Sequence, residues 1–292
     1  MRSRFQYFRP QSLVEALEFL ESYGHETSVL AGGTDLMIAV RNGETTSRFV
    51  MDVSRLDELR AIRKNDEVLT VGAAATFTEI SNSQEVLECA PVLARAARYV
   101  GSLQIRNVGT VGGNVANASP AADGVPPLVV LQARVHIQSS SSERTPLVEE
   151  IITAPYRTNL RPDELIVRFI IDPARTKKYK WSFQRIARRR TLAIARANAA
   201  ALAIIDPNGV VGDLRLCVGS ILPQPARMTG AEEILKGRVP DRELIWEAAK
   251  KVSSEMVHLS GVRPTTEYKR PAVEGLVMKA LTEILLEEKQ HA

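Results

Sequence analysis

The sequence predicts an α+β protein of about two domains, and three observations support this class. The chain has 292 residues, and domains usually contain roughly 100–200 residues each. Strand-length apolar runs alternate with helical patterns in the first part of the chain, whereas the last part has three strand patterns followed only by helices. A polar, proline-containing stretch separates the two parts. We therefore expect domains at 1–175 and 176–292, with the first divided into subdomains of about 1–58 and 59–175.

The first subdomain begins with a helix whose two ends are marked in the sequence. Ser12 and Glu15 fit a capping box, in which each side chain satisfies an orphan backbone donor. Gly24 is expected to close the helix as a C′ residue. A strand, a helix and a second strand then follow, an order that indicates a small α/β unit. They are expected at 28–31, 36–40 and 49–53.

The second subdomain alternates again between strand and helix patterns. Thr76 is placed to cap a short helix, and the serine run at 139–142 fits a solvated hairpin tip. The segment 107–120, rich in Gly, Asn, Ser and Pro, is predicted to be a loop. Strands are expected at 69–73, 134–138 and 165–171, and helices at 76–82, 91–100 and 125–132.

The C-terminal domain is predicted to be a three-stranded meander followed by helices. The last two strands are joined by Asp206-Pro207-Asn208-Gly209, a strong hairpin signal. The strands are expected at 181–187, 197–205 and 210–218, and the helices at 231–235, 241–256 and 267–288.

Composition excludes several classes of function. No run approaches the roughly 18 apolar residues of a membrane span, and the polar N-terminus lacks the apolar region of a secretory signal, so a cytoplasmic protein is expected. The net charge of +4 and the scattered aromatic residues do not favour nucleic acid as a partner. Cys89 and Cys217 are too few to hold a structural zinc or an iron–sulfur cluster, and the histidines share no ligand spacing.

The segment Ala31–Leu36 (AGGTDL) lies between a predicted strand and a predicted helix. Its glycines let the backbone approach an anion closely, and successive amide groups at a helix start point towards such a ligand. The spacing is neither the dinucleotide-binding Gly-x-Gly-x-x-Gly nor a Walker loop. Taken alone, a paired glycine after a strand is more often an ordinary turn than a binding site.

A second glycine-rich segment runs from Gln104 to Asp123 (QIRNVGTVGGNVANASPAAD). Three glycines, three asparagines and a threonine occur within eleven of its residues, a composition unsuited to a core. It offers many backbone donors and few bulky side chains, as expected of a surface that wraps a long polar ligand. An ordinary long loop is the alternative.

Together the two segments resemble the flavoprotein (medium) subunit of molybdenum hydroxylases, of the carbon monoxide dehydrogenase and xanthine dehydrogenase type. The resemblance covers essentially the whole chain. It implies a vanillyl-alcohol-oxidase-type FAD-binding fold, in which two N-terminal α/β subdomains grip FAD and a C-terminal domain with a three-stranded antiparallel sheet and helices closes over it. His25 and Cys89 lie outside the motifs, so FAD is expected to be bound without a covalent link.

The resemblance also implies a set of site residues. The first motif is expected to be the pyrophosphate loop of FAD, and a turn in the second motif is expected to contact phosphate as well. The first set is Val29, Leu30, Ala31, Gly32, Gly33, Thr34, Asp35 and Leu36, and the second is Thr110, Gly112, Gly113, Asn114 and Ala116.

Five further positions follow from the resemblance. Ser119, Pro120 and Asp123 are expected near the ribose and adenine, with Asp123 accepting from a hydroxyl; its alternative role is a helix N-cap. Ile166 is expected against the flavin, although its pattern also fits a core residue. Arg185 supplies the cation where the family usually has a lysine near the isoalloxazine. Gly124 occupies a place where relatives often have Ser or Thr.

The function implied is an electron-transfer subunit. Its partners would be a molybdopterin-containing large subunit and a [2Fe–2S] small subunit, arranged as a dimer of heterotrimers, and NAD or a quinone would accept the electrons. Two rivals remain open at this point: a stand-alone FAD-dependent oxidoreductase of the same fold, and an assembly module that uses the glycine segments and the basic run Arg188–Arg190 to bind a partner.

Overall fold

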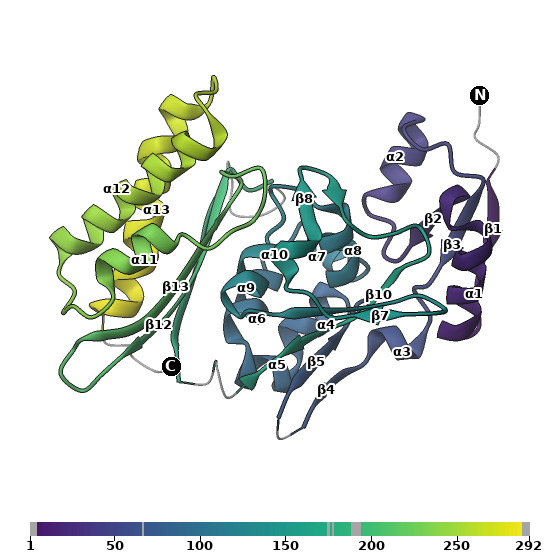
Figure 1. The fold of residues 1–292 in the computed structure, drawn as a ribbon, viewed down its shortest axis with the longest axis horizontal. Helices are drawn as coiled ribbons and strands as arrows, with labels where there is room; N and C mark the ends of the chain where they lie inside the picture. The colour runs from purple at the N-terminus through teal and green to yellow at the C-terminus, as the bar shows by residue number, and fades with distance from the viewer. Residues whose placement is uncertain (1–4, 66, 174–175, 177, 188–193, 288–292) are drawn as a thin grey trace.

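The computed structural model describes residues 5–65, 67–173, 176, 178–187 and 194–287. Figure 1 shows three layers side by side: an N-terminal sheet with its helices, a central sheet surrounded by helices, and a C-terminal sheet with long helices on its outer side. Among the described helices, none is long and apolar enough to cross a membrane.

The first subdomain is built on a three-stranded parallel sheet. The strand order is β1-β3-β2, and both neighbouring pairs are parallel. The predicted strand–helix–strand order is present, and β1 is an additional strand too short to give a sequence pattern. The elements are β1 (Gln6–Phe8), α1 (Leu13–Tyr23), the 3₁₀ turn η1 (Gly24–Glu26), β2 (Thr27–Leu30), α2 (Leu36–Asn42) and β3 (Phe49–Asp52).

The ends of α1 match the prediction only in part. The Ser12 hydroxyl accepts from the amide of Glu15 at 3.2 Å, but the Glu15 carboxylate accepts from the amide of Gln11 rather than that of Ser12. Gly24 closes α1 as its C-cap residue, but the expected C′ role is not found, because its φ of −57° is right-handed and it begins η1. Glycine is needed there for a different reason: a Cβ would lie 2.2 Å from the carbonyl oxygen of Pro162.

The second subdomain contains a five-stranded sheet in which every neighbouring pair is antiparallel. The order is β4-β5-β10-β6-β7, with the predicted hairpin tip at Ser139–Ser142 between β6 and β7. The strands are β4 (Ile62–Lys64), β5 (Leu69–Gly72), β6 (Arg134–Gln138), β7 (Glu143–Arg144) and β10 (Leu165–Ile171), with a separate pair β8 (Ile152–Ala154) and β9 (Arg157–Thr158). The helices are α3 (Asp57–Arg60), α4 (Phe77–Asn82), α5 (Gln84–Cys89), α6 (Pro91–Ala97), α7 (Leu103–Arg106), α8 (Val111–Asn117), α9 (Val125–Val130) and α10 (Val148–Ile151).

The prediction of a loop across 107–120 is wrong, because α8 lies within it. Thr110 caps this helix by accepting from the amide of Gly113 at 3.1 Å. Val111 and Val115 are four residues apart and both fully buried, as expected for one helix face. Two glycines and two asparagines among the seven helical residues lower the helix propensity. Because the helix is also short, its apolar spacing is not recognisable in the sequence.

The C-terminal domain has the predicted meander and helices. Its sheet has the order β11-β12-β13 with both pairs antiparallel. The predicted boundary at 175/176 falls beside residues 174, 175 and 177, which lie outside the described residues, so it stays a prediction. The elements are β11 (Lys180–Ile186), β12 (Ala197–Ile205), β13 (Val211–Gly219), α11 (Thr229–Leu235), α12 (Arg242–Ser260) and α13 (Thr266–Leu285).

Strand β12 is buried on both faces. Side chains alternate along a strand, and Ala199 and Ala201 pack with the C-terminal helices, whereas Ala200 and Leu202 belong to the apolar cluster of the second subdomain. The C-terminal sheet is therefore a layer between its own helices and the second subdomain, as Figure 1 shows. This position explains why the sequence of β12 is nearly uninterrupted in its apolar character.

Candidate functional site

The two glycine motifs, far apart in the chain, lie against each other. A Cβ at Gly32 would lie 2.0 Å from the carbonyl oxygen of Val108 and 2.9 Å from the Cα of Gly109. Gly109 directly precedes Thr110, the N-cap of α8. Because only a residue without a side chain permits this approach, Gly32 is the residue that lets the motifs meet.

The first motif presents backbone amides that the fold does not use. Among the described residues, no acceptor faces the amide groups of Gly32, Gly33, Thr34 and Asp35. Gly33 has a φ of +70°, a left-handed conformation that favours glycine. Consecutive free amides around such a turn are the usual means by which a backbone holds a phosphate oxygen. The motif therefore has the donors that an anion requires.

The second motif uses its amides differently. The amide of Val111 donates to Ala75 O at 3.1 Å and that of Gly112 to Ala73 O at 2.8 Å, so the start of α8 is fastened to the segment after β5. A Cβ at Gly112 would lie 2.7 Å from Ala73 O, which makes this glycine a packing requirement. The amide of Gly113 donates to the Thr110 hydroxyl. In the structure these bonds hold α8 in place. A phosphate contact by this turn stays a prediction.

The aliphatic residues around the first motif are more exposed than a core would allow. Val29 is 38% exposed, and Met37 and Ile38 of α2 are 43% and 57% exposed. Helix α2 contains no buried residue at all. Leu30, Ala31 and Leu36 are half-buried. A helix this apolar is normally covered, so its surface is available to a ligand or a partner.

Asp123 and Arg185, predicted separately, are brought together by the fold. Both carboxylate oxygens of Asp123 accept from Arg185 Nε, at 3.1 and 3.0 Å, and one also accepts from Asn198 Nδ2 at 2.8 Å. Burial raises the pKa of Asp123, while the charge of Arg185 and the hydrogen bonds oppose that rise. The N-cap alternative is wrong, because the N-cap of α9 is Gly124 and no side chain caps it.

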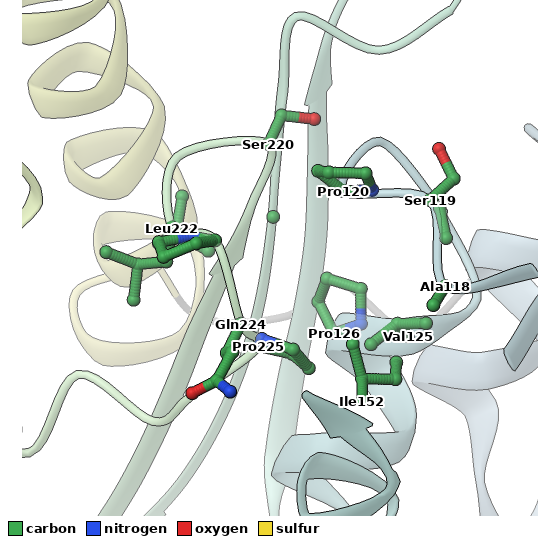
Figure 2. A pocket seen from close by; sticks show the side chains of 14 residues that line it. Ala118, Ser119, Pro120, Val125, Pro126, Ile152, Ser220, Leu222, Gln224 and Pro225 are labelled. Atoms are coloured by element: carbon green, nitrogen blue, oxygen red, sulfur yellow. The ribbon is translucent and has the colours of Figure 1, made fainter. Parts of the chain in front are cut away.

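Ser119 and Pro120 lie at the junction of the two domains. With Ala118 they form one side of a pocket whose other side is Ser220, Leu222 and neighbouring residues of the C-terminal domain (Figure 2). The amide of Ser220 donates to Pro120 O at 2.8 Å across this junction. The pocket volume of about 20 Å³ is enough for a water molecule and far too small for a ring system.

Three other positions near the motifs differ in burial. Ile166 is 5% exposed and packs in the apolar cluster of the second subdomain, which agrees with its core alternative. Ala116 is exposed. The Oδ1 atom of Asn114 is buried without a hydrogen-bond partner among the described residues, and a Cβ at Gly124 would lie 2.6 Å from it. A Ser or Thr at position 124 would therefore require Asn114 to shift.

The sequence does not point to Asn198 as part of this arrangement. The sequence feature that could have found it is the one polar side chain, Asn198, in the otherwise apolar strand β12. A buried amide without a partner is costly, so it must pair with a group from elsewhere in the fold. The basic run Arg188–Arg190 lies outside the described residues. Within the described part of the chain, no three His, Cys, Asp or Glu side chains are grouped as metal ligands.

Two family models match the chain in succession. The FAD binding domain in molybdopterin dehydrogenase matches residues 3–174, and the CO dehydrogenase flavoprotein C-terminal domain matches residues 182–284. The chain thus belongs to the family of FAD-binding medium subunits of molybdenum hydroxylases, of the carbon monoxide and xanthine dehydrogenase type. It is a flavoprotein oxidoreductase subunit, and FAD is its cofactor.

Relatives resemble the chain over nearly its whole length. The glyceraldehyde dehydrogenase medium chain of Sulfolobus acidocaldarius is 31% identical over 96% of this chain and 98% of its own. The nicotinate dehydrogenase FAD-subunit of Eubacterium barkeri is 32% identical over 96% of both. A solved carbon monoxide dehydrogenase of Hydrogenophaga pseudoflava superposes with a TM-score of 0.90 at 25% identity, covering 97% of this chain and 98% of that chain.

The residues present fit FAD. A dinucleotide needs a turn whose amides bind its diphosphate, and the first motif has four such amides without an acceptor among the described residues. It also needs close backbone approach, which Gly32 and Gly33 provide. The exposed aliphatic side chains beside that turn are suited to an aromatic ring.

Proposed function

We propose that this chain holds one FAD, without a covalent bond, at the junction of its two glycine motifs and passes electrons from an iron–sulfur partner to an external acceptor. The observation that carries the proposal is the contact between Gly32 and Val108, beside four amides that have no acceptor in the described part of the chain. It gives a single dinucleotide two chain segments to bind. The site residues predicted from the sequence belong to this proposal.

The chain's own residues bind and orient the cofactor. The amides of Gly32 to Asp35 would donate to the diphosphate, and the second motif would hold the first in position through Val108 and Gly109. Bound FAD supplies the ability to accept electrons singly and release them in pairs. The protein contributes position and electrostatics, because the redox chemistry belongs to the cofactor.

The partners are proposed from the family. The proposed complex contains a molybdopterin large subunit and a [2Fe–2S] small subunit in a dimer of heterotrimers, with NAD or a quinone as the acceptor. Support comes from relatives that are named as medium chains or FAD subunits of dehydrogenases. The cytoplasmic location expected from the sequence stays a prediction.

A pair of glycine substitutions tests the site. Gly33 and Gly43 lie before and after α2 with φ values of +70° and +74°, so replacing either by Ala introduces a similar backbone strain of roughly 1–2 kcal/mol. Only Gly33 belongs to the amide turn. A Cβ there would also lie 2.9 Å from Leu30 Cδ1, at the end of a flexible side chain, whereas a Cβ at Gly43 meets nothing within 4 Å. We expect Gly33→Ala to weaken FAD binding at least about tenfold, or about 1.4 kcal/mol, in a titration followed by flavin fluorescence.

Gly43→Ala is the matched control and should leave the FAD dissociation constant within about twofold, well under 1 kcal/mol. Equal affinity of the two variants would place the diphosphate elsewhere. Steady turnover of an organic substrate by the isolated, FAD-loaded chain would contradict the electron-transfer role and favour a stand-alone oxidoreductase.

A further inference from the structure

A buried polar group joins the C-terminal domain to the FAD-binding part, and we call it the Asp123 clasp. It consists of Asp123, on the connection between α8 and α9, with Arg185 of β11 and Asn198 of β12. Arg185 and Asn198 are directly opposite each other in the antiparallel register, so both side chains reach the same carboxylate. The side chains of Arg185 and Asp123 are 5% and 7% exposed, and Asn198 is fully buried.

The packing around Asn198 fixes the direction of its amide. Its Oδ1 has no hydrogen-bond partner among the described residues, and it faces Gly219 so closely that a Cβ there would lie 2.2 Å away. Rotating the amide would turn this oxygen towards the Asp123 carboxylate, and the two acceptors would repel each other. The one stable orientation therefore donates Nδ2 to Asp123, although an acceptor is left unsatisfied.

Hydrogen bonds from Ser220, Arg215 and Gln224 to the carbonyl oxygens of Pro120, Val130 and Thr153 also cross the junction, and the cluster between them is apolar. Phe183, Ala200, Leu202 and Cys217 of the C-terminal sheet pack into the same cluster as the core of the second subdomain. Apolar contacts are not directional, so they hold the domains together without fixing their alignment. A buried ion pair has the opposite character, because it adds little net stability but tolerates only one geometry.

We infer that Arg185 and Asn198 hold the C-terminal domain closed over the FAD-binding part by clasping Asp123, a positioning role additional to the place near the isoalloxazine that the proposed function gives Arg185, and that opening of this clasp governs the release of FAD. The inference rests on the proposed FAD site. Asp123 ends the second glycine motif, whose start contacts the first motif at Gly32, so a movement of Asp123 is transmitted to the proposed cofactor turn.

The test measures FAD release and exchange of the Ser220 amide, whose bond to Pro120 O crosses the domain junction. We expect Arg185→Met to accelerate FAD dissociation at least tenfold and to accelerate exchange of the Ser220 amide. Arg185→Lys, which keeps the charge, should recover most of both.

Combining Arg185→Met with Asp123→Asn should accelerate release by much less than the product of the single effects, because the carboxylate is then no longer left charged and unpaired.

The control is Ser253→Ala, which removes the hydrogen bond that the buried Ser253 hydroxyl of α12 donates to Glu274 of α13 inside the C-terminal domain. It should lower the melting temperature but leave FAD release within twofold. If Arg185→Met does not fold, Asn198→Ser removes one donor while retaining the ion pair, and it should give a smaller acceleration of the same two rates.

Unchanged release and exchange in the Arg185 or Asn198 variant, fully multiplicative effects in the double variant, or an equal effect of Ser253→Ala would overturn the inference. Failure of the proposed function has a different signature: the wild-type chain would bind no FAD. The Ser220 exchange measurement does not need FAD, so it still decides whether the clasp holds the domains together.

Discussion

Asp52 ties the N-terminal segment to the first sheet. It ends β3, is 5% exposed, and accepts hydrogen bonds from the Tyr7 hydroxyl, from Arg9 and from the amide of Ser54. Burial alone would raise the pKa of Asp52, but the hydrogen bonds from Ser54, Tyr7 and Arg9 outweigh it and lower the pKa to about 2. The folded state therefore favours the ionised carboxylate.

Acid should weaken the fold through this residue. The pKa of Asp52 is about 2 when folded and near 3.8 when unfolded, so its contribution is present above about pH 4 and is lost as the pH falls towards 2. That contribution is at most about 2.5 kcal/mol. Urea unfolding between pH 2 and 6 should give a shallower pH dependence for Asp52→Asn than for the wild type. Parallel curves would show that Asp52 is not stabilised as described.

At the scale of elements, α2 differs from every longer helix in having no buried side chain. Its apolar residues therefore do not hold the isolated chain together. Helix α4, in the second subdomain, provides a contrast, because its Ile80 is fully buried. The buried residues of α4 therefore stabilise the fold, whereas the exposed apolar residues of α2 are available to a ligand or a partner.

Polar substitutions in these helices should have unequal costs. Ile38→Ser of α2 should change the free energy of unfolding of the isolated chain by less than about 0.5 kcal/mol. Ile80→Ser of α4 should cost about 3 kcal/mol or more, because it removes buried methylenes and buries a hydroxyl. Urea unfolding measures both. A loss at Ile38 as large as that at Ile80 would mean that α2 is part of the core.

Strand β12 gives a test of close packing. Ala201 is fully buried on the face that meets the C-terminal helices, and α13 crosses this strand. Ala201→Leu should cost about 1–3 kcal/mol, because the added atoms force the helix away from the sheet. Thermal unfolding of the variant checks this, and an unchanged melting temperature would indicate a gap that the structure does not contain.

The longer elements could be predicted from the sequence because their signals are local. Ser12, Thr76 and the turn at Asp206–Gly209 mark starts and turns that the structure confirms. Strands β7 and β9 have two residues each and give no period. Helix α8 was concealed by its glycines, of which Gly112 is needed because it packs against the distant backbone of Ala73.

The two motifs of the candidate site could be found in the sequence, but the contacts between their residues could not. Nothing local to Gly32 reveals that it backs onto Val108. In the same way, Arg185 and Asp123 each have a motif signal, whereas their pairing and the part played by Asn198 depend on how two domains meet. Contacts between distant segments are set by the fold as a whole, and a single sequence does not display them.

At the scale of the whole molecule, one apolar cluster runs from the second subdomain into the C-terminal sheet. A shared core couples the unfolding of its two sides, so we expect one calorimetric transition with equal calorimetric and van't Hoff enthalpies. Two separated transitions would show that the domains unfold independently and that the junction contributes little.

The most direct test of the central claim is amide hydrogen exchange with and without FAD. The account predicts that FAD slows exchange at Gly32, Gly33, Thr34 and Asp35, whose amides have no acceptor among the described residues, while the amide of Gly112, already bonded to Ala73, changes little. FAD that binds and leaves the exchange of those four amides unaltered would contradict the claim that this turn holds the diphosphate.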